Sequence, residues 1–286
     1  MPDLAQLWQR IEKIPQLSAT AGRLLRLQSS QEGSLAEIGR AVSVDPSLTA
    51  AVLRSANSAA ARPAQPICSV VQAVSYLGER MVLAMALAAC VPGGMVMPLE
   101  GYRSERGALW RHSLSVALCA RELAKLCRPA LGPDLAFTAG LLHDIGKPVL
   151  GLILGSDTTA LLKGIEARRR ADSARAEHEL VGVDHAEVGE ALARRWNLPE
   201  ALCFALRHHH DPSLAPPAHR ALAGAVHLGD LVTLRADDAI QADELAQVVE
   251  KADLAGLRPG PAEIDRLLAF AQKEMVNAMA TLEEAA

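Results

Sequence analysis

Almost all of the side chains that can form a core in this chain are aliphatic. Hydrophobic residues make up 50% of the 286-residue sequence, whereas aromatic residues make up only 3%. A core of Ala, Leu and Val favours closely packed helices. Nothing in the first 91 residues alternates with the period of two that a half-buried strand needs. We therefore expect an all-α fold, and the length allows two subdomains.

Signals that begin helices are clear in the first third of the chain. Ser34 and Glu37 form a capping-box pattern, and Asp45 places a good N-cap residue before Pro46 at the first helical position. The Pro- and Gly-rich stretch 92–101 then interrupts the helical pattern. This stretch is the predicted domain boundary.

This boundary and a second one after residue 235 divide the chain into three predicted parts. Residues 1–101 form an N-terminal helical subdomain, residues 102–235 form a second helical subdomain, and residues 236–286 form a C-terminal helical extension. The extension is amphipathic, so it packs either on the core or on a second copy of the chain. A homo-oligomer is therefore one of two open alternatives.

All nine histidines lie in the second predicted subdomain, which separates a histidine-rich part of the chain from a histidine-free one. We expect a long helix over 104–127 with His112 in its first half, and a second helix over 133–146 with His143 and Asp144 in its last turn. Imidazole nitrogens bind borderline divalent ions, and an adjacent carboxylate can bridge two of them. The pattern predicts a metal site.

The predicted site holds two metal ions and draws on side chains from separate helices. Its candidate ligands are His112, His143, Asp144, His185, His209, His210 and Asp230. Asp144 is the natural bridge between two ions about 3.5 to 4 Å apart, and Lys147 lies one turn further along. Asp144 and Lys147 are the candidate catalytic residues, because a carboxylate bridge and a nearby positive charge suit attack on a phosphoryl group. A vestigial polar cluster without metal is the alternative.

Other residues of the same types have structural interpretations. His178, His219 and His227 lie on apolar helices, where a core histidine with one satisfied hydrogen bond is the commoner role. His208 would be a ligand only if the helix register shifted by one residue. Asn57 in RSANSA either caps a helix end or has a functional role.

The histidine and aspartate pattern resembles the HD superfamily of metal-dependent phosphohydrolases, and the chain resembles one branch of it, the HDOD family. The resemblance covers roughly residues 14–234, through IPQLSATAGRLLRL, VDPSLTAAVLRSANSA, ICSVVQAVSYLGERMVLAMAL, WRHSLSVALCARELA, AFTAGLLHDIGK, HAEVGEALARRWNLP and RHHHDP. It implies an all-helical fold and a role in bacterial signalling. Many HDOD proteins have lost metal ligands and act as output modules, whereas this sequence retains the ligand set of the related HD-GYP phosphodiesterases.

Two features of the sequence depart from the HD-GYP pattern. RHHHDP continues into SLAPPAHR without the Gly-Tyr-Pro motif, which argues against hydrolysis of cyclic di-GMP. Ala108 stands one turn before His112, where some trinuclear HD-GYP proteins have a glutamate. We therefore expect two ions rather than three.

We expect a bacterial signalling protein whose di-metal site belongs to a regulatory binding module for a nucleotide, a phosphoester or a signalling protein. The alternative is a metal-dependent phosphohydrolase acting on a phosphomonoester or a nucleotide phosphodiester. The divalent ions are Fe, Mn, Zn or Ni, between which the sequence does not choose.

Charge, hydropathy and cysteine content argue against several other classes of protein. A net charge of -4 and a pI near 6.1 argue against binding to nucleic acid by neutralisation of phosphates. The longest apolar run, 81–91, has 11 residues, which is short of the ~20 that cross a bilayer. The five cysteines form no Cys-x-x-Cys pair, which is typical of reduced thiols in a cytoplasmic protein.

Overall fold

The computed structural model describes most of the chain, and the described part is helical. Its residues are 8–9, 11–30, 34–58, 61, 63–91, 94–99, 102, 104–127, 130–154, 173–236, 241, 245, 249, 257 and 259–283. Within them the extended pairing is limited to an isolated bridge between Leu99 and Ser104. The predicted all-α class is confirmed.

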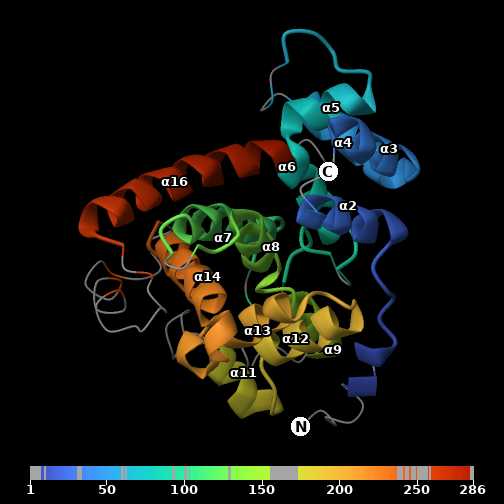
Figure 1. The fold of residues 1–286 in the computed structure, drawn as a ribbon. Coiled ribbons are helices and arrows are strands. Elements are labelled where there is room, and N and C mark those ends of the chain that lie inside the picture. The colour runs from blue at the N-terminus through green and yellow to red at the C-terminus, as the bar shows by residue number, and fades with distance from the viewer. Residues whose placement is uncertain are drawn as a thin grey trace.

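Five helices form the N-terminal part and gather on one side of the molecule (Figure 1). They are α2 (Ala19–Ser30), α3 (Leu35–Ser43), α4 (Pro46–Ala56), α5 (Val70–Leu77) and α6 (Glu79–Ala88). The predicted capping box is present at α3, where Ser34 accepts from the Glu37 amide and Glu37 accepts from the Ser34 amide. Asp45 likewise caps α4 by accepting from the Leu48 amide. Local sequence signals therefore fix where both helices begin.

The structure assigns Asn57 a structural role at the C-terminal end of α4. Its side-chain amide donates to the carbonyls of Leu53 and Ile67, and its side-chain oxygen accepts from the Ile67 amide at 2.7 Å. These bonds cap α4 and hold the main chain at Ile67, ten residues further along the sequence. The capping interpretation is the one that this geometry supports.

The remaining helices and the turns between them contain all the histidines, and α16 forms the C-terminal end of the described chain. They are α7 (Ala108–Ala124), α8 (Pro133–Leu142), α9 (Gly146–Leu154), α11 (Ser173–Val181), α12 (His185–Arg195), α13 (Glu200–His208), the 3-10 helix η3 (Pro212–Leu214), α14 (Pro217–Ala236) and α16 (Pro261–Glu283). Helix α7 packs most extensively against α8, α14 and α16, and α16 lies along it in Figure 1. Helix α7 is thus the centre of this part of the fold.

The helix predicted over 104–127 corresponds to α7, which is shorter than predicted at both ends. Ser104 pairs with Leu99, and Gly107 adopts a left-handed φ of 78° that an α-helix cannot contain, so α7 begins at Ala108. After Ala124 the chain continues in tight turns with bonds between residues three apart.

The prediction of a helix over 133–146 was wrong at the C-terminal end. Helix α8 begins at Pro133 as expected but ends at Leu142, and Gly146 begins α9. Pro148 lies in the first turn of α9, where its missing N–H has no intrahelical partner to lose. Pro148 is therefore compatible with the start of α9 and does not mark the end of α8.

Two apolar clusters hold the helices together. The larger one is continuous from α2–α6 into α7, α8, α9, α12 and α13, and the smaller one joins α7 and α14 to α16. Trp110 and Trp196 are both 4% exposed and pack in the larger cluster. Leu267 and Ala271 of α16 are buried in the smaller cluster, so this helix packs on the core of its own chain. Most of the predicted extension before α16 lies outside the described residues.

Several polar contacts join the N-terminal part to the histidine-rich part. The Trp196 indole N–H donates to the Pro15 carbonyl at 3.0 Å, and Arg195 donates to the Ile14 carbonyl. Arg80 on α6 forms an ion pair with Asp134 on α8 at 2.6 Å. The domain limits at 101 and 235 remain predictions.

No single helix in the described part of the chain is long and apolar enough to cross a membrane. Helices α5 and α6 reach the required length and composition only as a pair, and they are bent by 102° at Gly78.

Candidate metal centre

The His143-Asp144 pair lies in the turn that joins α8 to α9. His143 is the C-cap residue of α8, and the Lys147 amide donates to the Asp144 carbonyl as α9 begins. Both side chains are only 1% exposed. Since neither residue is inside a helix, the turn can aim both side chains into the same buried space.

The first group of candidate ligands surrounds one oxygen of the Asp144 carboxylate. His143 Nε2 lies 3.3 Å from Asp144 Oδ2, and His112 Nε2 lies 3.8 Å from the same oxygen. His112 comes from α7 and also contacts Asp230 of α14, with Nε2 3.0 Å from Oδ1. Three separate parts of the chain therefore supply two imidazoles and two carboxylates to this group.

The second group surrounds the other oxygen of the same carboxylate. His185 Nε2 lies 3.2 Å and His209 Nε2 lies 3.9 Å from Asp144 Oδ1. His185 Nε2 also lies 2.9 Å from His210 Nε2 and 3.4 Å from His209 Nε2. Each oxygen of Asp144 thus faces a different set of histidines, which is the arrangement that a bridging ligand requires.

The hydrogen bonds of the ring Nδ1 atoms determine which nitrogen of each histidine carries the proton. His143 Nδ1 lies 2.7 Å from the Gly140 carbonyl, and His209 Nδ1 lies 2.8 Å from the Leu206 carbonyl. A carbonyl can only accept, so both Nδ1 atoms carry hydrogen and leave an Nε2 lone pair in the neutral ring. These lone pairs converge on the space beside Asp144, where they would repel one another without a cation.

The buried polar atoms of the cluster fit divalent metal ions. His143 Nε2 and Asp144 Oδ1 are buried and make no hydrogen bond within the described residues. A buried polar atom without a partner is costly, and coordination to a cation would satisfy both atoms. Imidazole and carboxylate donors in this ratio suit Fe, Mn, Zn and Ni. The donor set does not distinguish among these metals.

Charges around the cluster shift the pKa values of its members in opposite directions. Burial lowers the pKa of His185, but the Glu177 and Asp144 carboxylates outweigh it and raise the pKa to about 9. Burial together with His143 and His185 lowers the pKa of His209 well below its ordinary value. The cluster therefore contains too many imidazoles for all of them to be protonated together, and a metal removes this conflict.

Lys147 lies at the edge of the cluster. Its ammonium donates to Asp144 Oδ2 at 2.6 Å and lies 5.9 Å from the centre of the Tyr102 ring. Burial lowers the pKa of Lys147, but the adjacent Asp144 carboxylate outweighs this effect and the pKa is raised. Lys147 therefore keeps its positive charge beside the predicted bridging carboxylate.

The structure thus brings all seven predicted ligands and Lys147 into one region. Close groups are formed by His112, His143 and Asp144, and by His185, His209 and His210, with Asp230 held by His112. A family model for the HDOD domain matches residues 14–212, a range that includes all of these residues except Asp230. The chain belongs to the HDOD family.

Two relatives show how far the sequence similarity to this HDOD chain extends. An uncharacterized protein of Treponema pallidum is 30% identical over 228 residues, which is 79% of this chain and 43% of that protein. Ribonuclease Y of Thermus thermophilus is 33% identical over 154 residues, which is 52% of this chain and 21% of the ribonuclease. The HDOD chain thus spans less than half the length of either relative.

A solved structure matches the HDOD chain over nearly its whole length. It comes from Shewanella amazonensis, and its description proposes a phosphohydrolase. The two chains are 30% identical with a TM-score of 0.69, and the match covers 99% of this chain and 98% of the other. The all-helical arrangement is therefore shared with a known fold.

Sequence reasoning missed Glu177, which contacts the cluster from α11. Glu177 is fully buried, and its Oε2 accepts from the amide and from Nδ1 of His185 at 2.7 and 2.6 Å. A signal was present, because Glu177 lies four residues from both Ser173 and Val181 on the buried side of the helix. An acidic residue on a buried helix face is unusual unless it has a polar partner.

The four remaining histidines lie outside the two ligand groups. His227 donates from Nδ1 to the His209 carbonyl at 2.7 Å, which satisfies it as expected. His219 and His208 stack on the Phe204 ring, with centroids 5.1 and 6.1 Å away. The core interpretation was wrong for His178, whose side chain is 59% exposed because it lies on the outer face of α11 near Glu187.

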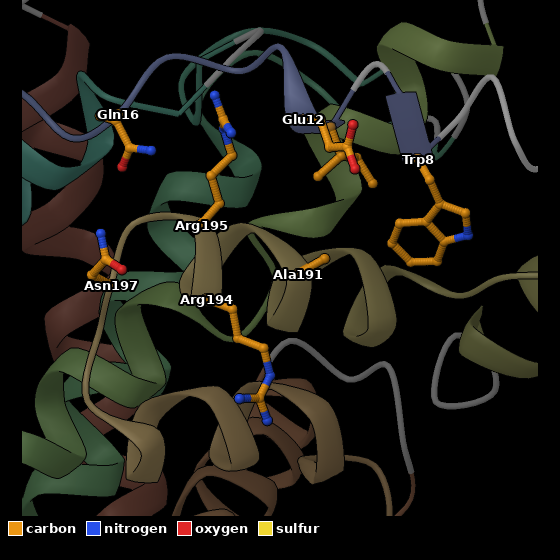
Figure 2. Close-up of a pocket in the computed structure, with 8 residues that line it drawn as sticks. Trp8, Glu12, Gln16, Ala191, Arg194, Arg195 and Asn197 are labelled. Carbon is orange, nitrogen blue, oxygen red and sulfur yellow. The ribbon is translucent and has the colours of Figure 1, made fainter.

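A separate pocket lies between the N-terminal segment and α12 (Figure 2). Its volume is about 400 Å³, and its lining residues are Trp8, Ile11, Glu12, Gln16, Ala191, Arg194, Arg195 and Asn197. None of the predicted metal ligands lines it. The pocket is therefore not part of the histidine cluster.

Proposed function

We propose that this HDOD protein is a metal-dependent phosphohydrolase that acts on a phosphomonoester or a nucleotide phosphodiester. The observation that carries the proposal is the position of Asp144, whose two oxygens face two different groups of histidines 3.2 to 3.9 Å away. His112, His143, Asp144 and Asp230 would hold one ion, and His185, His209, His210 and Asp144 would hold the other.

Two divalent ions held by these residues would supply Lewis-acid chemistry for a phosphoryl oxygen and would make water a better nucleophile toward phosphorus. Asp144 would fix the separation between the ions, because it contributes one oxygen to each group. Lys147 is positively charged at the edge of the cluster, and its side chain is 19% exposed. It would bind a non-bridging phosphoryl oxygen and stabilise the charge that develops there.

A regulatory binding module with a structural metal site is the second candidate. Its support is the burial of the cluster, because His143, Asp144, His185 and His209 are each at most 1% exposed. Closed metal sites of this kind are typical of structural ions, whereas catalytic sites keep a position open. On this alternative a nucleotide or a signalling protein would bind elsewhere on the surface.

Turnover by metal-loaded protein decides between the two candidates. Wild-type protein loaded in turn with Mn, Fe, Zn, Ni and Mg is assayed on p-nitrophenyl phosphate, bis(p-nitrophenyl) phosphate and nucleotide diesters. We expect hydrolysis with at least one metal and a fall of about 10 to 100-fold in kcat/KM for Lys147→Ala. Lys125→Ala, which removes an exposed lysine from α7's C-cap position, is the matched control. No turnover in protein shown to contain metal would contradict the hydrolase and favour the regulatory module.

A further inference from the structure

Glu177 is a buried carboxylate whose burial the fold alone does not explain. It is fully buried, and within the described part of the chain its ion-pair partner is His185, with no Lys or Arg nitrogen in contact. A buried carboxylate is tolerated only where it is paired and hydrogen-bonded, and the described partners of Glu177 are His185 and Tyr102. A carboxylate buried in this way is expected to have a specific task.

The amide of His185 is one partner of Glu177, but helix capping does not account for the whole arrangement. Helix α12 already has a complete capping box, in which Asp184 and Glu187 accept from each other's amides. The second bond of Glu177 Oε2 goes to the His185 ring at 2.6 Å. Its other oxygen, Oε1, accepts from the Tyr102 hydroxyl at 2.9 Å. The carboxylate is therefore held from both sides and directed at the ring.

The bond to the ring determines what His185 presents to the cluster. A carboxylate at Nδ1 favours the Nδ1–H form of the neutral ring, and in that form the Nε2 lone pair is directed toward the other members of its group. That nitrogen lies 2.9 Å from His210 Nε2 and 3.2 Å from Asp144 Oδ1. His143 and His209 achieve the same orientation with main-chain carbonyls. Glu177 is the side-chain equivalent of those carbonyls.

The charge of Glu177 also compensates for an imbalance between the two ligand groups. The first group contains the carboxylates of Asp144 and Asp230, whereas the second contains three imidazoles and only a share of Asp144. A carboxylate behind an imidazole raises its strength as a ligand and adds negative charge near the ion. Glu177 supplies this charge to the group that needs it.

We propose that Glu177 is a positioning residue for the ion held by His185, His209 and His210, and that Tyr102 keeps Glu177 in place. The inference rests on the di-metal centre of the proposed function, but it concerns occupancy rather than turnover. Loss of Glu177 should therefore affect one ion and spare the ion held by His112, His143 and Asp230.

Metal content and affinity of a set of variants test this assignment. Glu177→Leu removes both the hydrogen bond and the charge, so we expect the metal content to fall from two ions to one per chain. Glu177→Gln keeps a bond to the ring and should retain two ions, with the affinity for the weaker one reduced about 10 to 100-fold in competition with a chelator. Tyr102→Phe should weaken the same ion only severalfold. Glu190→Gln, on α12 and paired with Arg194, is the control and should match wild type.

The outcomes are distinct from those of the hydrolase assay. Two ions at wild-type affinity in both Glu177 variants would overturn the inference, as would equal loss of both ions from folded Glu177→Gln. A wild-type protein that binds no metal would overturn it together with the metal centre. If Glu177→Leu does not fold, Glu177→Gln decides by its affinity alone. A wild type that holds two ions without turnover would contradict the proposed hydrolase and leave the occupancy test fully applicable.

Discussion

Gly146 allows α9 to approach α12 at the place where the metal centre is built. A Cβ atom at this position would overlap the His185 carbonyl and would lie 2.8 Å from the His185 carbonyl carbon and 3.0 Å from the Gly189 amide nitrogen. All of these atoms belong to the main chain, so no side-chain rotation can relieve the overlap. Gly146→Ala must therefore move the start of α9 away from α12.

The size of the effect follows from these distances. Carbon atoms in good contact lie about 3.5 Å apart or more, so the helices must separate by at least about 0.7 Å. Overpacking of this kind costs about 1 to 3 kcal/mol, and a main-chain overlap belongs at the upper end. Alanine recovers up to about 1 kcal/mol through its higher helix propensity. We expect Gly146→Ala to lower the free energy of unfolding by about 2 kcal/mol.

Gly151→Ala is the matched control, because it makes the same change in the same helix. A Cβ atom at Gly151 meets nothing within 4 Å in the described structure. This variant should gain about 0.5 to 1 kcal/mol from helix propensity alone. The two substitutions in α9 are thus expected to act with opposite signs.

Thermal unfolding in the presence of a chelator measures both variants without a contribution from bound metal. At about 2 to 4 °C per kcal/mol, Gly146→Ala should melt about 4 to 8 °C below wild type and Gly151→Ala slightly above it. Equal melting temperatures for the two variants would refute the close approach of α9 to His185. With metal added, Gly146→Ala should also show weaker metal binding, because His185 is displaced.

Two further predictions concern the metal bridge and a helix cap. Asp144→Ala removes an oxygen from each ligand group, so elemental analysis should find strong loss of both ions, together with a lower melting temperature in metal-containing buffer. His219→Ala, which removes the stack on Phe204 and a contact with Glu200, should keep wild-type metal content, and equal metal in Asp144→Ala would contradict the bridging role. Ser34→Ala removes the capping box of α3 and should cost about 1 kcal/mol in urea unfolding, whereas an unchanged midpoint would show that the cap contributes nothing.

Local sequence signals predicted the helix starts better than the helix ends. The starts at Ser34 and Asp45 depend on side chains that bond within one turn, so the sequence contains the whole interaction. The turn at His143 was missed because Pro148 is compatible with either the end of one helix or the first turn of the next. Packing of Gly146 against His185 selects the second possibility, and that contact spans 39 positions of sequence.

The candidate site shows the same division between local and distant information. Histidines are informative by residue type alone, so the sequence was enough to group the seven candidate ligands. Residue type does not single out Glu177, because Glu179 two positions later is the same residue and lies exposed beside Arg175, so only helical spacing from Ser173 and Val181 distinguishes Glu177. The difference in burial arises when α11 folds against α12. Residues that act through a ligand are therefore harder to predict than the ligand itself.

The most direct test of the metal centre is anomalous diffraction at the absorption edge of the bound metal, measured on crystals grown without chelator. We predict two peaks about 3.5 to 4 Å apart, one on each side of the Asp144 carboxylate. One peak should lie among His112, His143 and Asp230, and the other among His185, His209 and His210. A single peak, or metal bound anywhere else in the chain, would contradict the two-ion centre.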